Sequence, residues 1–441
     1  MTTSAPPPAP SPAPSPALAR AAELYLDLHR NPELSGSEER TAARLAEWLT
    51  AAGYRVESGI GGHGVAGVLR NGPGPVVMLR SELDALPVEE RTGLPYASTR
   101  TARTPDGRTV PVMHACGHDV HLACAAGAAA ELAADAERWR GTVLVVGQPA
   151  EETLQGARAM LADGLYQRFE PPSVVLAQHT APLPAGMVAH GEGPMTAGSV
   201  TLEVVIHGRG GHAAAPHLAV DPVVAAASVV LRLQSVVAQE TSPAEQVVLS
   251  VGSLEAGSQA NIIPDRATLR VTVRGFSEHV LERVTAAVRR IVHGQAAASG
   301  CPQEPTVRVV SRSGVNLPDL DLTAAVRAAH QEAFGARRVT GWPPALATDD
   351  FPLFGAAGLA LHGVAGVRTA YWMLGMVGPE QWAATPGSTA AEKLAALPAN
   401  HSPKFRPHAR LTLQTGIAAL VGAATSQLLP VDQSPAQRPC P

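Results

Sequence analysis

Two short segments of the chain concentrate side chains that can bind metal ions or move protons. Residues 113–121 read MHACGHDVH, with three histidines, a cysteine and an aspartate, and residues 148–152 read QPAEE. Thiolate, imidazole and carboxylate are the ligand types that zinc and related cations use in hydrolases. Taken alone, a C-x-H pair is more often a buried cysteine beside a hydrogen-bonded histidine, and an acidic pair is common at a helix N-terminus. Their chemical meaning depends on whether the fold brings them together.

Three apolar runs would place such side chains along one edge of a sheet. Residues 75–80, 142–147 and 173–178 are short continuous apolar runs, which are typical of strands buried on both faces of a parallel sheet. Side chains of metal-binding types follow these runs: Glu82 and Asp84, then Glu151 and Glu152, then His179. Because the carboxyl ends of parallel strands meet at one edge, we expect a single cluster of histidine, cysteine and carboxylate there, as metal hydrolases use.

Cys116 and His118 would add the cysteine and a histidine to this cluster. In an extended chain residues i and i+2 face the same way, and Gly117 lets the backbone approach a ligand closely, so the two side chains could grip one metal ion or a close pair. A helix is predicted over 120–135, with Asp119 as its N-cap. Of the two glutamates in QPAEE, one could bind metal while the other faces the cleft as a general base.

The rest of the pattern predicts a discontinuous α/β domain with a smaller domain inserted into it. Helical periodicity covers residues 17–30 and 37–52, with Ser37 as the N-cap of the second helix. From about residue 198 the strands alternate apolar and polar residues, and the element order βαββαβ is the split-βαβ, ferredoxin-like arrangement. We therefore predict a mixed, largely parallel sheet with flanking helices, plus an inserted α+β ferredoxin-like lid. The predicted boundaries are a disordered leader at 1–16, the first part of the catalytic domain at 17–197, the lid at 198–311, the second part of the catalytic domain at 312–430, a long loop within it at 379–400, and a disordered tail at 431–441.

Composition excludes several classes of protein. The net charge is −4 and no basic block occurs, which argues against nucleic-acid binding. No window approaches about 18 consecutive apolar residues, so no membrane span is expected. The N-terminus lacks the basic and apolar regions of a signal peptide, and the four cysteines show no disulfide-like spacing. We expect a cytoplasmic protein.

Eight segments, taken in order, resemble one protein family. They are RSELDALP, MHACGHDVHLA, QPAEE, QHTAPLPAG, GRGGHAAAPHLAVDP, NIIPDRATLRVTVR, TDDF and NHSPKF. This ordered set resembles the M20 metallopeptidase family, in particular its amidohydrolase branch of hippurate hydrolases and auxin–amino-acid conjugate hydrolases. The resemblance covers roughly residues 17–425. It implies a zinc-exopeptidase-like catalytic domain that holds two divalent ions, which could be zinc, manganese, nickel or cobalt.

The resemblance also implies a role for individual residues. The metal ligands would be Cys116, His118, Glu152, His179 and His401. Glu151 would be the general base, and Asp84 would orient a ligand from behind. His212, on the lid, would meet the substrate carbonyl, in some family members across a dimer, and Asn261 and Arg274 would hold the substrate carboxylate. The lid could also join two copies of the chain as a homodimer.

The implied activity is hydrolysis of the amide bond in a small N-acyl amino acid, by a hydroxide between two metal ions with Glu151 as the base. The alternative is an exopeptidase of the same mechanism that cuts dipeptides, whose free ammonium group would need an acidic partner such as Asp349 or Asp350. A non-catalytic protein on this scaffold would show a broken ligand set or a lost Glu151, and neither is seen. Two departures from the branch bear on the site: Glu82 replaces the usual Asp, and Asp349 replaces the Glu of EDF.

Overall fold

A nine-stranded sheet carries the segments singled out above. Its strands are β1 (Arg55–Ile60), β2 (Gly64–Asn71), β3 (Val76–Glu82), β6 (Trp139–Gln148), β7 (Val174–Pro184), β8 (Val188–His190), β15 (Val339–Gly341), β16 (Arg368–Val377) and β17 (Leu429–Pro430). They lie in the order β1-β2-β6-β3-β7-β16-β8-β15, with β17 paired to β6. The central pairs β6–β3, β3–β7 and β7–β16 are parallel, whereas β1–β2, β2–β6 and β8–β16 are antiparallel. The predicted mixed, largely parallel sheet is confirmed.

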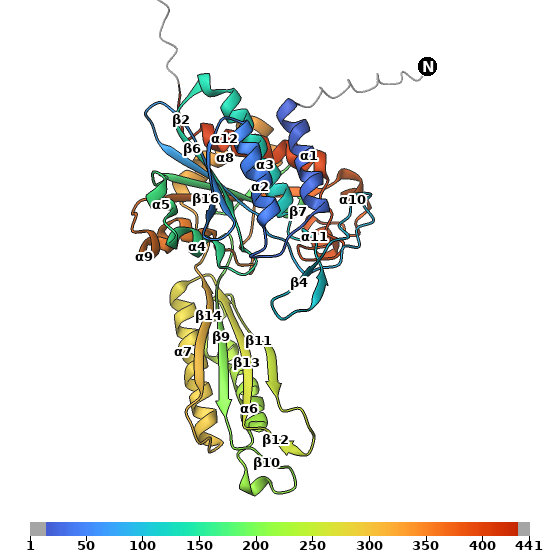
Figure 1. Ribbon diagram of the computed structural model, residues 1–441, viewed down its shortest axis with the longest axis vertical. Helices are drawn as coiled ribbons and strands as arrows, with labels where there is room; N and C mark the ends of the chain where they lie inside the picture. The colour runs from blue at the N-terminus through green and yellow to red at the C-terminus, as the bar shows by residue number, and fades with distance from the viewer. Residues whose placement is uncertain (1–14, 431–441) are drawn as a thin grey trace, which may run out of the picture.

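The computed structural model describes residues 15–430, so the predictions for residues 1–14 and 431–441 lie outside the described residues. Helices cover both faces of the large sheet, as Figure 1 shows. One face packs on α1 (Pro16–Arg30), α2 (Glu39–Ala51), α3 (His118–Ala134), α8 (Leu320–Phe334) and α12 (Ala409–Thr425). The other packs on α4 (Gly156–Ala162), α5 (Leu165–Arg168), α9 (Leu359–His362) and the 3₁₀ turn η4 (Phe351–Phe354). Because successive side chains of a strand point to opposite faces, Leu79 enters the first core and Met78 the second.

A second sheet forms the lower part of the molecule in Figure 1. Its elements are β9 (Gly198–His207), α6 (Pro222–Glu240), β11 (Val247–Ala256), β13 (Arg266–Gly275), α7 (Glu278–Ala298) and β14 (Thr306–Ser313). The strand order β11-β13-β9-β14, antiparallel throughout, is that of the ferredoxin-like fold. A short ribbon of β10 (Gly211–His212) and β12 (Ile262–Ile263) lies at the end of this domain farthest from the large sheet.

Helix α6 is long and apolar enough, by length and composition, to cross a membrane. It is nevertheless built into the second domain, where Ala225, Val229 and Leu233 are buried in the core beneath the four-stranded sheet. A single helix of this kind is weak evidence for a membrane span, since core helices pass the same test.

The remaining elements are short. They are β4 (Thr101–Arg103), β5 (Thr109–Pro111), α10 (Pro379–Ala384), α11 (Ala390–Ala396) and the 3₁₀ turns η1 (Ala136–Arg138), η2 (Pro216–Leu218), η3 (Ala336–Arg338) and η5 (Ala356–Gly358). The prediction of a long loop over 379–400 is therefore wrong, because two short helices form there and Thr389 closes a capping box with Glu392.

Both predicted N-caps are also wrong. Helix α2 begins at Glu39, and Glu38 rather than Ser37 occupies its N-cap position. Helix α3 begins at His118 after Gly117, whose φ of +86° places it in the left-handed region, so Asp119 lies inside the first turn. Its carboxylate is within 2.7 Å of His29 Nδ1.

Two buried histidines join β8, α8 and α12. His330 Nε2 is 3.0 Å from the Ala419 carbonyl, which can only accept, so the proton of His330 is on Nε2. His330 Nδ1 must then accept from His190 Nε2, 3.0 Å away, and both rings are neutral. Burial lowers the pKa of His190 to about 3 and that of His330 to about 4, from an ordinary 6.5.

This pair predicts a loss of stability in mild acid. A base whose folded pKa is depressed contributes its full stability above the unfolded pKa, here near 6.5, and loses it as the pH falls toward 4. We expect the free energy of unfolding to fall by up to about 1.4 kcal/mol per pH unit for each histidine across this window. Urea unfolding of the parent and of His330→Gln, from pH 7.5 to 4.5, tests this. The variant should show a flatter pH dependence, and parallel curves would contradict the assignment.

Candidate metal centre and active site

The structure brings together the five side chains that the family resemblance implies as metal ligands, at the carboxyl edge of β3, β6 and β7. Ligand atoms of Cys116, His118 and His179 all lie within 4.8 Å of one another, and so do those of Cys116, Glu152 and His401. Cys116 belongs to both groups. The five side chains could therefore hold two neighbouring cations.

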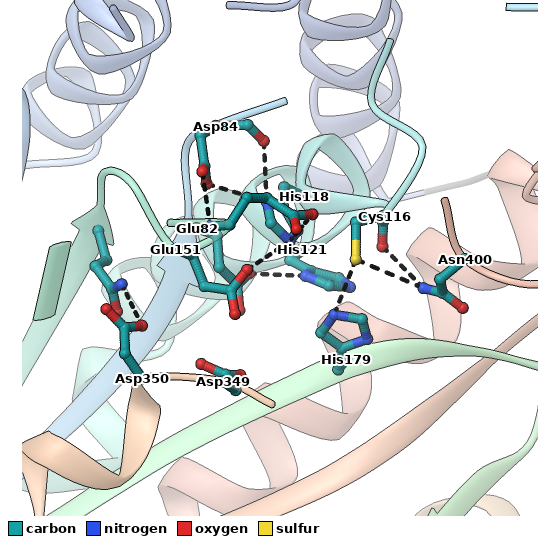
Figure 2. Close-up of polar contacts among 12 residues, drawn as sticks. Glu82, Asp84, Cys116, His118, His121, Glu151, His179, Asp349, Asp350 and Asn400 are labelled. Atoms are coloured by element: carbon teal, nitrogen blue, oxygen red, sulfur yellow. Dashed lines mark hydrogen bonds and ion pairs between the residues drawn. The ribbon is translucent and has the colours of Figure 1, made fainter. Parts of the chain in front are cut away.

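The backbone fixes which nitrogen of two histidines faces this centre. His118 Nδ1 lies 2.9 Å from the Asp84 carbonyl and 3.2 Å from its carboxylate (Figure 2). His179 Nδ1 lies 3.0 Å from the Thr180 carbonyl. Carbonyl oxygens only accept, so both Nδ1 atoms carry the proton. The Nε2 atoms are left with free lone pairs, and that of His179 is 3.4 Å from Cys116 Sγ. A proton held away from the site is the usual arrangement for a metal-binding histidine.

Two buried atoms at this centre lack any hydrogen bond. They are His118 Nε2 and Glu152 Oε1, the latter 3.3 Å from His401 Nε2 but not in hydrogen-bond geometry. A buried polar atom without a partner costs about 1–3 kcal/mol. A cation would satisfy both atoms at once, and a donor set of thiolate, imidazole and carboxylate suits zinc and neighbouring transition metals. The residues present therefore fit a metal centre.

The local backbone differs from the extended chain predicted around Cys116. Gly117 turns the chain in the left-handed region, and a Cβ placed there would lie 2.5 Å from Thr180 Oγ1. Only glycine permits this turn without displacing the strand that carries His179. Likewise, His179 does not end its strand as predicted, because β7 continues to Pro184. His401 adopts a positive φ of 69° and donates its N–H to the Ala115 carbonyl at 2.7 Å.

Glu151 stands beside the predicted ligands in a turn that follows β6. Its Oε2 lies 3.6 Å from His118 Nε2, and it lines a cavity of about 590 Å³. Burial, together with the carboxylates of Asp349 and Glu152, raises the pKa of Glu151 well above its ordinary value. A carboxylate that binds a proton readily, at the edge of a cavity, is suited to general acid–base work.

A buried guanidinium lies behind Glu151. Arg80 contacts Glu82 through Nη1, donates to Asp349 Oδ1 from Nη2 at 2.8 Å and to Gln148 Oε1 from Nε at 2.8 Å, and reaches Asp350 at 3.3 Å. Although burial opposes ionisation of Glu82, Arg80 and His121 hold its pKa well below the ordinary value. Three acids thus share one fully buried cation.

The two residues that depart from the pattern of the resembled family both contact this guanidinium. Glu82 is one methylene longer than the usual Asp, and Asp349 is one methylene shorter than the usual Glu. Both carboxylates reach the guanidinium of Arg80.

A hydrogen-bonded chain connects the acids around Arg80 to the metal-binding edge. The Thr180 N–H donates to His121 Nε2 at 2.8 Å, so His121 Nδ1 carries the proton and donates to Glu82 at 2.7 Å. Thr180 is next to His179, and its Oγ1 donates to the Cys116 carbonyl at 2.9 Å. Sequence reasoning missed Arg80 and His121. The period of two along a strand, which puts Arg80 on the same face as Glu82, could have found the first.

The three residues predicted to meet the substrate lie in two different places. Arg274, on β13, lines the cavity and donates to the Leu346 carbonyl at 2.8 Å, so it joins the second domain to the first. His212 belongs to β10 of the β10–β12 ribbon, and Asn261 directly precedes β12, where its carbonyl accepts from the Ala213 N–H at 3.0 Å. Neither His212 nor Asn261 lines the cavity of its own chain, because the ribbon lies at the far end of the second domain (Figure 1).

Comparison with known proteins finds relatives that cover most of the chain. The chain is 34% identical over 346 residues to the N-acetylcysteine deacetylase of Bacillus subtilis, covering 76% of this chain and 87% of that protein. It is 35% identical over 331 residues to the hippurate hydrolase of Campylobacter jejuni, covering 74% and 82%. Among solved structures, the Bacillus subtilis YXEP protein, described as a dinuclear metal binding peptidase from the M20 family, superposes with a TM-score of 0.70 at 26% identity, covering 94% of this chain and 98% of that one.

The family model described as peptidase family M20/M25/M40 matches residues 78–386, which include every predicted site residue except His401. His401 lies beyond the matched segment, yet the fold returns it to the carboxylate of Glu152. With a matching family model, matching relatives and a matching fold, the chain belongs to the M20 peptidase family of amide-bond hydrolases.

Proposed function

We propose that the protein hydrolyses N-acyl amino acids, with Glu151 as general base and then general acid. The observation that carries this proposal is the position of Glu151, buried at the cavity wall beside five gathered ligand side chains. The relatives named for deacetylation of N-acetylcysteine and for hydrolysis of hippurate support the substrate class.

Two divalent cations, zinc, manganese, nickel or cobalt, would be held by Cys116, His118, Glu152, His179 and His401, and would supply Lewis acidity toward a water and an amide carbonyl. Glu151 takes the proton of the attacking water and returns it to the nitrogen of the departing amine. Asp84 keeps His118 in the tautomer that presents Nε2 to the site.

Arg274 is the proposed partner of the substrate carboxylate. Among the described residues that line the cavity it is the only arginine or lysine, and it faces the site from the second domain. Its side chain lies among the hydroxyl groups of Ser199, Thr201 and Thr272, which line the same wall. An amino-acid carboxylate bound there would leave the amide pointing toward Glu151.

The charge around Arg80 argues against the dipeptidase alternative. A dipeptide brings a free ammonium group that needs an acidic partner beyond Glu151 and Glu152. Asp350 is fully buried and accepts from Gln148 Nε2 and the Ala157 N–H, and Asp349 is bound by Arg80 and by the Tyr371 hydroxyl. Neither acid has a free oxygen to offer an ammonium group, so an uncharged acyl group fits the cavity better.

His212 and Asn261 enter the proposal through a second copy of the chain. Their ribbon is too far from the cavity of its own chain, and apolar side chains beside it are exposed, Leu218 at 67% and Ile262 at 56%. The helix α6 also exposes Val224 and Leu231. We take the lid as the homodimer contact, with His212 of each chain completing the site of the other, where its imidazole would donate to the oxyanion.

Glu151→Gln removes the proton acceptor and keeps the shape of the side chain. We expect kcat on an N-acyl amino acid to fall by about 10²–10⁴-fold, while metal analysis still finds two ions per chain. The exposed Glu137→Gln is the matched control and should be unaffected. Near-parental turnover by Glu151→Gln would contradict the base assignment.

N-acetylmethionine and glycylmethionine differ chiefly in whether the acyl group ends in a methyl or an ammonium group. Because Asp349 and Asp350 are occupied by Arg80, we expect kcat/KM of the metal-loaded enzyme to be at least about 100-fold higher for the acetyl compound, as expected for an unpaired charge in a buried site. Faster turnover of the dipeptide would contradict the N-acyl amino acid proposal and favour the exopeptidase alternative.

Exchange of the lid tip can be tested by complementation. Glu151→Gln and His212→Ala should each be nearly inactive, but their co-expressed mixture should recover about a quarter of parental activity, because half of the random dimers contain one intact site. The control pair, Glu151→Gln with Glu152→Ala, damages the same centre in both chains and should recover nothing. Absence of recovery in the first mixture would exclude a shared site.

A further inference from the structure

The residue before Glu151 has an unfavourable backbone conformation. Ala150 has φ of +50°, in the left-handed region that residues with a Cβ avoid at a cost of roughly 1–2 kcal/mol. Its carbonyl accepts from the Gln155 and Gly156 N–H groups at 3.2 and 3.3 Å, which closes the turn after β6. The direction in which Glu151 leaves the backbone depends on this turn, so something must hold it.

Glu38 supplies that hold from the start of α2. Its side chain is completely buried, and Oε1 accepts from the Ala150 N–H at 2.8 Å and from the Gly36 N–H at 2.7 Å. It makes no capping bond to its own helix, although it occupies the N-cap position. It does not line the cavity, so it cannot touch a bound substrate.

A second carboxylate holds the other side of the turn. The Glu152 N–H donates to Asp84 Oδ2 at 3.0 Å, and Ser35 Oγ donates to the same oxygen at 2.7 Å. The backbone amides on both sides of Glu151 are therefore bound by buried carboxylates, and residues 35–38 contribute to both bonds. Charge-assisted bonds of this kind are about twice as strong as neutral ones.

We propose that Glu38 is a positioning residue for the reaction: it stabilises the left-handed conformation of Ala150 and so aims Glu151 at the substrate and Glu152 at the metal centre. The proposal rests on the proposed function of Glu151. It assigns to Glu38 an effect on the chemical step that is separate from substrate binding, since Arg274 and the cavity walls stay in place.

The test compares kcat, KM, metal content and thermal unfolding of four variants. Glu38→Ala should lower kcat by about 10–100-fold, as loss of catalytic orientation does, with KM within about twofold and two metal ions per chain. Glu38→Gln should keep most of the activity, because its amide oxygen can accept the same two N–H groups. The exposed neighbour variant Glu39→Ala is the matched control and should behave as the parent.

The fourth variant, Glu38→Ala/Ala150→Gly, separates positioning from a general loss of structure. Glycine adopts a positive φ without the Cβ penalty, so the turn should form without Glu38 and kcat should recover at least about fivefold over Glu38→Ala. If Glu38→Ala does not fold, Ala150→Val serves instead, since a β-branched residue disfavours the turn while Glu38 is present, and it should show the same fall in kcat.

Parental kcat in folded Glu38→Ala, or in Ala150→Val, would overturn the proposal, and so would failure of Ala150→Gly to restore any activity. A different result would show that the proposed function itself is wrong: Glu151→Gln would then turn over substrate, whatever the Glu38 variants do.

Discussion

Crowding of negative charge at one edge of a sheet is the constraint on which the rest of this structure depends. Glu82, Asp349 and Asp350 sit together around Arg80, which is the cation that makes their burial tolerable. Isolated buried carboxylates would neutralise by binding protons rather than remain charged. Asp350 shows this tendency, because burial raises its pKa to about 7 even beside Arg80.

The second group of donors, Cys116, Glu151 and Glu152, has histidines beside it but no arginine or lysine in contact among the described residues. The guanidinium of Arg80 would neutralise the first group of acids, and exchangeable metal ions would neutralise the second. The chain of Glu82, His121 and Thr180 ties the two halves together, so that the permanent cation also orients the strand bearing His179. This separation leaves Glu151, which lies between the halves, free to gain and lose a proton.

The sequence was sufficient for the parallel sheet and for the gathering of ligands from β3, β6 and β7, because buried apolar runs and shared strand ends are local signals. It was insufficient where the chain turns. The left-handed Gly117 moved the start of α3, and β7 ran past His179, because main-chain hydrogen bonds to neighbouring strands extended the strand beyond its apolar run. His401 was predicted only from its motif, since no periodicity connects it to the site.

Contacts across long sequence separations account for the other misses. Glu38 and Ala150 are 112 residues apart, and nothing in either segment signals their bond. His212 was placed at the substrate by resemblance alone, whereas the fold carries it to the outer end of the second domain. Local pattern cannot decide whether a residue serves its own chain or a neighbouring copy.

Arg80 donates to both carboxylate oxygens of Asp349, which limits the substitutions that position 349 can accept. The loop bearing Asp349 forms part of the pocket wall. The Asp349 carboxylate also contacts Arg80, a buried residue of β3 that pairs with Glu82 of the same strand. A change of acid length at position 349 would therefore alter both the pocket wall and the contact with Arg80, which Glu82 shares. Redesign of this wall for another substrate has to preserve the charge balance of the buried core as well as the shape of the pocket.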